Sequence, residues 1–203
     1  MTAYRPVAGF LAAMALTATS VLGLGLMPAQ AQEPAKKKTC AQGGPCRVGD
    51  KGPGGGTVFY VAKTKQAWGR YLEAAPAKWS GKLNSPQLAW CDVKDVSIPG
   101  TAGAALGAGK ANTAALTAAC GSGAANRAAA YRGGKKSDWY LPSKGELNVL
   151  YKKRKTVGGF PDWTHWSSTE ASPQAAWLQG FAGGVQNETN KTYLGSLRPI
   201  RAF

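Results

Sequence analysis

The residues of this sequence whose types and spacing could do chemistry are, first of all, cations. Four follow one another from Lys152 to Lys155, Lys135 and Lys136 precede them, and the formal net charge is +15 at pH 7. Closely spaced Lys and Arg side chains form salt-sensitive contacts with sulfates and phosphates. We therefore predict a polyanion-binding surface at Lys152, Lys153, Arg154, Lys155, Lys135 and Lys136. The alternative is a solvated helix end that only keeps the protein soluble.

Tryptophan is the second informative residue type, because the chain has seven. An indole fills a core, but it also offers a flat platform for a sugar ring. Trp68 and Trp79 lie in polar stretches, KTKQAWGR and PAKWSGK. We expect these two to be exposed and to be possible sugar platforms, and most of the tryptophans to lie in the core.

Catalytic groups are sparse. His165 is the only histidine, Ser167 could share its strand face, and Asp162 is near in sequence. We expect a hydrogen-bonded strand histidine, no catalytic residue and no enzyme activity. An envelope enzyme that acts on glycans with Glu170, Asp162 or His165 stays an alternative, as does a structural envelope protein without a small ligand. Paired carboxylates for glycoside hydrolysis could be drawn from Glu73, Asp138, Glu146 and Glu170, but nothing in the sequence places two of them at the required distance.

The glycine-rich segments do not match nucleotide-binding loops. AALGAGKA has Ala104 where a phosphate loop needs Gly and Ala111 where it needs Ser or Thr. With one histidine and no C-x-x-C pair, a zinc site is also unexpected. We therefore expect neither a cofactor nor a metal.

The N-terminus indicates export. A single early cation, Arg5, precedes a long apolar run from Val7 to Met27, and Ala29 and Ala31 stand before a plausible cleavage point. This pattern predicts a signal peptide over residues 1–31, with an uncleaved anchor as the alternative. After cleavage we expect no transmembrane span and a periplasmic, extracellular or cell-surface location. The partner is then an anionic polysaccharide or another extracytoplasmic polyanion, with no dedicated nucleic-acid partner.

The four cysteines, Cys40, Cys46, Cys91 and Cys120, are an even set in an exported chain, which favours two disulfides. Three pairings are possible. We favour Cys40 with Cys46 and Cys91 with Cys120, because each bridge is then local.

The elements that must position these residues suggest one domain. We expect a basic linker over 32–45 and a domain over 46–203. Ser143 and Glu146 form a capping box for a helix whose last turn carries Lys152 to Lys155 and which ends at Gly158 and Gly159. Further predicted helices cover residues 111–120 and 123–132, and predicted strands cover residues 57–62, 70–76, 165–170, 175–184, 190–195 and 197–203. Helices in the middle with strands at both ends indicate an α+β domain whose terminal strands pair.

Several motifs occur together and in a fixed order: VGDKGPGGGTVFYV, YLEAAP followed by Trp79, GGKKSDWYLPSKGELNVLY, WSSTE and RPIRAF. Over residues 46–203 the chain resembles the family of extracellular bacterial domains named for the C-terminal domain of the collagen-like adhesin Lcl. That family is similar to the C-type-lectin-like superfamily, in which a helix start like Leu141-Pro142-Ser143 with Glu146 recurs. The resemblance implies a C-type-lectin-like mixed domain with short helices and an antiparallel sheet that pairs N- and C-terminal strands.

The resemblance also implies adhesin-like binding of sulfated glycosaminoglycans. The adhesin forms trimers through a collagen-like stalk, and this sequence has no Gly-x-y repeat, so the oligomeric state does not carry over. The superfamily includes formylglycine-generating enzymes with a metal-binding cysteine pair. That activity is not carried over, because Cys91 and Cys120 are interpreted as a disulfide.

Overall fold

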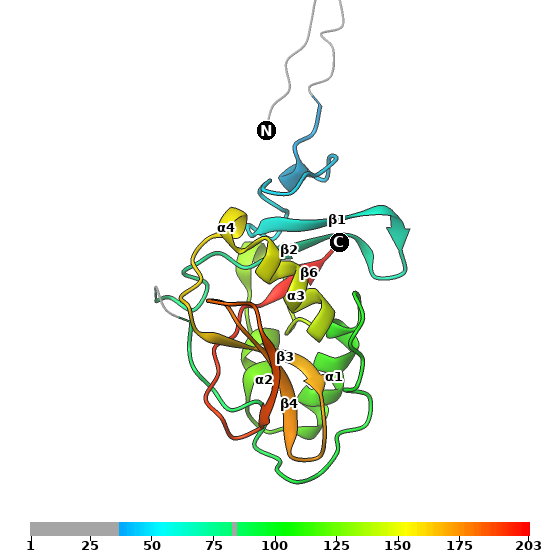
Figure 1. Cartoon of the computed structure of the whole chain (residues 1–203). Helices are drawn as coiled ribbons and strands as arrows, with labels where there is room; N and C mark the ends of the chain where they lie inside the picture. The colour runs from blue at the N-terminus through cyan, green and yellow to red at the C-terminus, as the bar shows by residue number, and fades with distance from the viewer. Residues whose placement is uncertain (1–36, 83–84) are drawn as a thin grey trace, which may run out of the picture. The chain divides into compact units, whose positions relative to one another are not determined.

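A computed structural model of the chain describes residues 37–82 and 85–203. The predicted signal peptide and the start of the predicted linker, with Lys36, lie outside these residues, and the division into linker and domain stays a prediction. The described part is an α+β domain with four helices and two three-stranded antiparallel sheets (Figure 1). The predicted α+β class is therefore confirmed.

The first sheet joins both ends of the domain. Its strands are β1 (Thr57–Gln66), β2 (Gly69–Ala74) and β6 (Ile200–Ala202), in the order β1-β2-β6. β1 and β2 form a hairpin, and β6 pairs with β2 so that Leu72 faces Ala202. The sequence prediction that N- and C-terminal strands pair is confirmed, because YLEAAP and RPIRAF supply adjacent strands.

The second sheet consists of β3 (Thr164–Glu170), β4 (Ala175–Gly180) and β5 (Gln186–Asn190), in that order. The strand predicted over 190–195 is wrong, because β5 ends where that segment begins. The side-chain oxygen of Asn190 accepts hydrogen bonds from the Thr192 amide (2.9 Å) and hydroxyl (2.8 Å). Such a turn offers the backbone an alternative to the strand ladder and so ends the strand.

The predicted helices form with shifted ends. α1 is Gly109–Ala119 and α2 is Ala124–Ala129. α3 is Lys144–Lys152, and its capping box is confirmed: the Ser143 hydroxyl accepts from the Glu146 amide (3.2 Å), and the Glu146 carboxylate accepts from the Ser143 amide (2.8 Å).

The predicted single helix through the four cations is wrong in its second half. α3 stops at Lys152, Lys153 leaves helical geometry, and a short α4 covers Arg154–Val157. In one continuous helix Lys152 and Lys155 would lie three residues apart on the same face, where like charges repel and disfavour a regular continuation. The cations therefore lie across the α3–α4 junction instead of along one helical turn.

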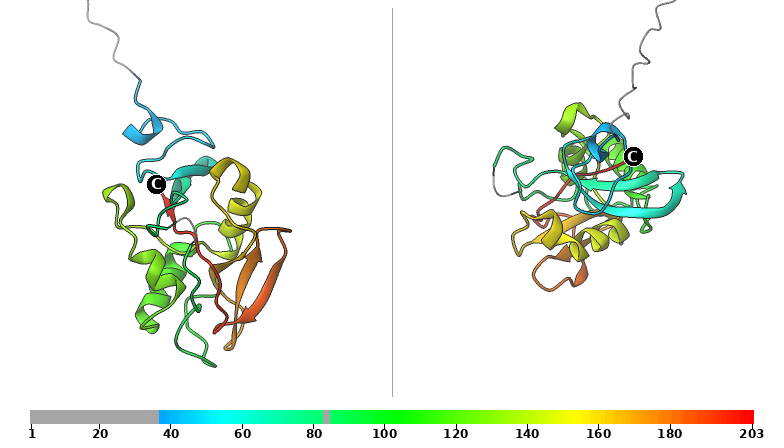
Figure 2. Two further views of the ribbon diagram at one scale, coloured as in Figure 1. Left: turned by 90° about the vertical axis from the view of Figure 1, so that its left-hand side faces the viewer. Right: turned by 90° about the horizontal axis from the view of Figure 1, so that it is seen from above.

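Two cores hold the layers together. The first lies between α1, α2 and the second sheet and contains Trp90, Leu116 and Trp166. In Figure 2 (left), the C-terminal segment, drawn in red, runs between these green helices and the orange sheet. The second core lies between α3 and the first sheet, where Leu147 and Leu150 of the predicted apolar stripe pack against Phe59.

Candidate polyanion-binding site

We use the name basic corner for Lys152, Lys153, Arg154 and Lys155 at the α3–α4 junction. The three lysines are exposed, and Arg154 is half-buried. Arg154 stacks on Tyr151 with 4.0 Å between its guanidinium carbon and the ring centroid, and it donates to the Tyr151 carbonyl at 3.1 Å. No cation of the basic corner forms an ion pair with a carboxylate in the described part of the chain. The corner thus presents three unpaired ammonium groups beside one guanidinium held in place.

A shallow pocket of about 220 Å³ adjoins the basic corner. Its lining includes Lys155, the loop residues Gly158, Gly159 and Phe160, and Asp162 at one side. Gly158 and Gly159 have φ of 73° and 70°, a backbone conformation that favours glycine, so they end α4 and turn the chain sharply. The loop therefore has a defined shape next to the cations.

Arg198 anchors this loop from inside. It is fully buried, donates to the carbonyls of Ala75 (2.8 Å) and Gly159, and lies 4.3 Å from the Phe160 ring centroid. Arg198 forms no ion pair within residues 37–82 and 85–203, and burial lowers the pKa of its guanidinium to about 10. An arginine with that pKa stays charged at neutral pH, so a buried positive charge lies behind the Gly159 loop.

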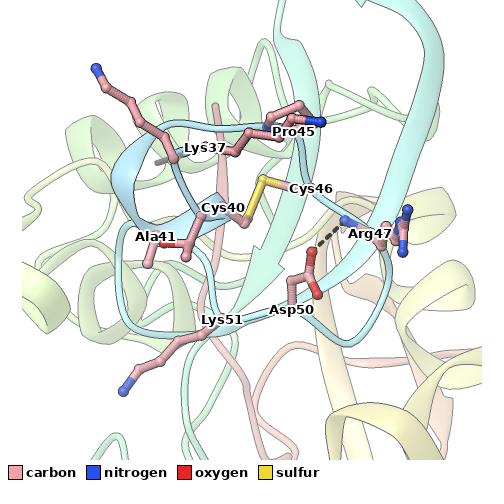
Figure 3. Close-up of a pocket in the computed structure, with 10 residues that line it drawn as sticks. Lys37, Cys40, Ala41, Pro45, Cys46, Arg47, Asp50 and Lys51 are labelled. Carbon is pink, nitrogen blue, oxygen red and sulfur yellow. Dashed lines mark hydrogen bonds between the residues drawn. A yellow bond between two sulfur atoms is a disulfide. The ribbon is translucent and has the colours of Figure 1, made fainter. Parts of the chain in front are cut away.

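The N-terminal loop brings further cations to the site. The predicted Cys40–Cys46 disulfide is present, with 4.7 Å between the Cα atoms. Around it, an open pocket of about 680 Å³ is lined by exposed cations. We call Lys37, Lys38, Arg47 and Lys51 the disulfide-loop cations. Figure 3 shows Lys37, Arg47 and Lys51 extending outward from the loop, while Asp50 accepts the Arg47 amide at 2.7 Å.

The disulfide loop and the basic corner are neighbours. A Cβ atom at Gly49 would lie 3.5 Å from the Thr156 methyl group in α4. Sequence reasoning missed Arg47 and Lys51, although cations on both sides of a short disulfide were a usable signal. Their closeness to α4 depends on tertiary packing, which no local pattern encodes.

Lys135 and Lys136 lie beside a different part of the domain. Lys135 ends the short 3₁₀ helix Gly133–Lys135, and a side chain at Gly134 would clash with the Gly54 backbone. The pair therefore lies next to the turn over residues 52–56 that leads into β1. Lys135 is exposed and Lys136 is half-buried.

The two tryptophans predicted as sugar platforms, Trp79 and Trp68, differ in their exposure. Trp79 is 7% exposed and donates from its indole nitrogen to the Ser85 hydroxyl at 3.2 Å, so the expectation that it is exposed is wrong. Its polar sequence neighbours point outward while the ring packs edge-on against Tyr131, 5.6 Å between centroids. Trp68 is half-buried and lines a surface pocket with Tyr60, 6.1 Å between ring centroids.

The candidate carboxylates each have structural partners. Glu73 is fully buried, pairs with Arg201 at 2.9 Å and accepts the Gly54 amide; Asp138 pairs with the same arginine at 2.5 Å. Glu170 pairs with the buried Lys191 at 2.6 Å. Glu146 is committed to the helix cap, and its burial raises its pKa. Within the described residues these four carboxylates therefore make structural contacts of the fold.

His165 is a hydrogen-bonded strand histidine, as predicted. It is fully buried in β3, its Nδ1 lies 3.2 Å from the Trp163 carbonyl, and its ring packs on Phe181 at 4.2 Å between centroids. Burial, and then the charge of Arg198, lower its pKa to about 3. The Ser167 hydroxyl donates to the Trp177 carbonyl at 2.8 Å and Asp162 is exposed, so these three side chains do not form a triad.

The second predicted disulfide, Cys91–Cys120, is also present, with 5.6 Å between the Cα atoms. Cys91, Asp92 and Cys120 form a cluster of ligand-type residues, but both sulfurs are bonded to each other and offer no thiolate.

Neither a model of a known protein family nor a curated protein matches the chain. Among the described residues, no helix has the length and apolar character that crossing a membrane requires.

Proposed function

We propose that the protein is an exported, non-enzymatic binding domain that contacts anionic glycans or other envelope polyanions, in the manner of an adhesin. The observation that carries the proposal is the set of unpaired, exposed lysines of the basic corner, next to the disulfide-loop cations. Glu73, Asp138 and Glu170 are matched to Arg201 and Lys191 inside the fold and so do not neutralise this surface. Asp50 and Asp162 lie beside its more numerous cations and offset only part of their charge.

The chemistry of these groups suits a repeating polyanion. Lysine is a flexible point charge, and each contact with a sulfate or phosphate releases a counterion, so affinity falls steeply with salt. The pocket lined by Lys155, Phe160 and Asp162 gives the surface a recess of mixed polarity beside the lysines, which a flat charged patch lacks. A polymer with spaced acidic groups could contact the corner and the disulfide loop together, which would raise its avidity.

The finer fold assignment is part of the same proposal. The pairing of β2 with β6 and the capped helix after Leu141 and Pro142 support a C-type-lectin-like domain of the Lcl C-terminal type. Two disulfides are consistent with a periplasmic, extracellular or cell-surface location.

The test is the salt concentration at which the protein elutes from a heparin column. In the variant Lys152→Gln, Lys153→Gln and Lys155→Gln, three charges are removed while Arg154 keeps its stacking on Tyr151. The matched control removes three exposed charges elsewhere, at Lys82, Lys94 and Lys110. We expect the first variant to elute at clearly lower salt than the control, with the slope of log affinity against log salt reduced by about 2 to 3. Equal elution of the two variants would reject the basic corner, and no retention of the wild-type protein would reject the function.

A further inference from the structure

We propose that a second surface, the hairpin cleft, binds one acidic sugar residue of a polysaccharide. The hairpin cleft is the pocket of about 530 Å³ between the β1–β2 hairpin and the loop over residues 104–107, and its lining includes Tyr60, Lys63, Gln66, Trp68 and Leu106. The inference extends the proposed function by naming a ligand class. It rests on other residues than the basic corner, so either can fail alone.

The cleft has an aromatic wall. Tyr60 and Trp68 are both half-buried, with ring planes inclined by 43°. Apolar faces of sugar rings pack on such surfaces, and an indole also carries a hydrogen-bond donor. The Trp68 Nε1–H has no acceptor among the described residues and is not fully buried, so it is available to a ligand hydroxyl or carboxylate.

The lining of the cleft also contains polar and positive groups from β1. Lys63 is exposed and forms no ion pair within residues 37–82 and 85–203. Gln66 donates to the Thr64 carbonyl and hydroxyl, both at 3.0 Å, and keeps its side-chain oxygen as an acceptor. No carboxylate is part of the described lining. A ligand that matches one cation, one acceptor and an aromatic face is a sugar with a carboxylate or sulfate group.

The loop wall of the cleft is fixed by the start of α3. The Ser143 hydroxyl donates to the Ala105 carbonyl at 2.7 Å, and the Gly145 amide donates to the Ala104 carbonyl at 2.8 Å. The Gly107 amide donates to the Glu146 carboxylate at 3.0 Å. The capping box therefore also holds one side of the cleft in place.

Gly107 fixes the indole on the same side. It has φ of 88°, and a Cβ atom there would collide with the five-membered ring of Trp68. The indole can lie against this backbone only because residue 107 is glycine. A cleft whose wall and platform are both set before binding loses little freedom when it takes a ligand.

The test follows the Trp68 indole N–H resonance by NMR in the full protein. The probes are a tetramer of galacturonic acid, its uncharged methyl ester, and sodium sulfate at matched ionic strength. We expect the acid to shift this resonance saturably, the ester to bind about tenfold more weakly, and sulfate to leave it in place. An unmoved resonance with the acid, or equal affinity for acid and ester, would overturn the inference.

Paired variants locate the charge contact. Lys63→Gln should reduce the affinity for the acid to that for the ester, whereas Lys65→Gln, an exposed lysine of the same hairpin outside the lining, should change nothing. Equal effects of the two substitutions would contradict the assignment. The variant without the three basic-corner lysines should keep its Trp68 shift, because the cleft has its own cation. A heparin column that fails to retain the wild-type protein while the Trp68 shift persists would reject the basic corner and leave the cleft standing.

Discussion

At the scale of single residues, most of the charged groups buried in this domain lie beside an opposite charge. Arg201 is shared by Glu73 and Asp138, and Lys191 is matched by Glu170, so each of these charges has an opposite charge beside it. His165 has no such partner: its Nε2 meets no hydrogen-bond partner in the described structure, and Arg198 lies nearby. The neutral imidazole is therefore the form that the fold accepts, and protonation must work against burial and against a like charge.

We predict that His165 makes the protein sensitive to acid. Its pKa is about 3 in the folded protein and about 6.5 in the unfolded chain. The unfolded state therefore binds the additional proton, and the stability contributed by neutral His165 is complete above pH 6.5 and is lost as pH falls toward 3. His165→Phe, which suits neighbours such as Phe160 and Phe181, should lose less stability between pH 7 and pH 4 than the wild type, by roughly 3 kcal/mol. Urea unfolding at both pH values measures this, and parallel losses in the two proteins would refute it.

At the scale of elements, the start of α3 has two structural roles. Ser143 caps the helix and also binds the loop over residues 104–107, while Glu146 accepts the Gly107 amide besides closing the capping box. One turn of helix therefore sets both the direction of α3, which ends at the basic corner, and the wall of the hairpin cleft.

We predict that Ser143→Ala lowers the free energy of unfolding by about 2 kcal/mol. The substitution removes the cap and one of the two hydrogen bonds that the Ala105 carbonyl accepts, leaving it only the Ala108 amide. Thr117→Ala is the matched control, because its exposed hydroxyl bonds only the Ala114 carbonyl of its own helix, and it should cost less than about 0.5 kcal/mol. Chemical denaturation compares them, and similar losses would show that the cap has no special role.

At the scale of the whole molecule, the two disulfides join segments that are not paired with each other in either sheet. Cys91–Cys120 spans 29 residues and joins the end of α1 to the chain that follows Trp90, whereas Cys40–Cys46 spans 6 and closes the basic loop. The first bridge lies within the larger core, and the second belongs to a small cluster with Val58.

We predict unequal costs of removing the two bridges. Loop-closure entropy gives about 3.5 kcal/mol for Cys91→Ala with Cys120→Ala and about 2 kcal/mol for Cys40→Ala with Cys46→Ala. Urea unfolding of the two double variants measures which disulfide contributes more to the free energy of unfolding. The reverse order would mean that native packing, not loop length, sets the contribution of these bridges.

The sequence carried the local features of this domain and the pairing of its terminal strands, but not the long-range packing of single side chains. The capping box at Ser143, the strand that starts at Thr57 and both disulfides follow from neighbouring residues, and the structure confirms them. The burial of Trp79 could not be predicted, because its partner Tyr131 lies 52 residues away in sequence. The contact between Gly49 and Thr156 also joins segments far apart in sequence, so Arg47 and Lys51 were missed although the run from Lys152 to Lys155 was singled out.

The pairing of β2 with β6 has a consequence for how the chain reaches this state. Leu72 meets Ala202, and the Glu73–Arg201 ion pair joins positions 128 residues apart. Domains dominated by contacts of such separation have high contact order and fold slowly, since a large loop must close before the contacts form. The first sheet cannot be completed until residues 200–202 have been synthesised. We therefore expect the complete first sheet to form only after synthesis, whatever the order in which the other elements fold.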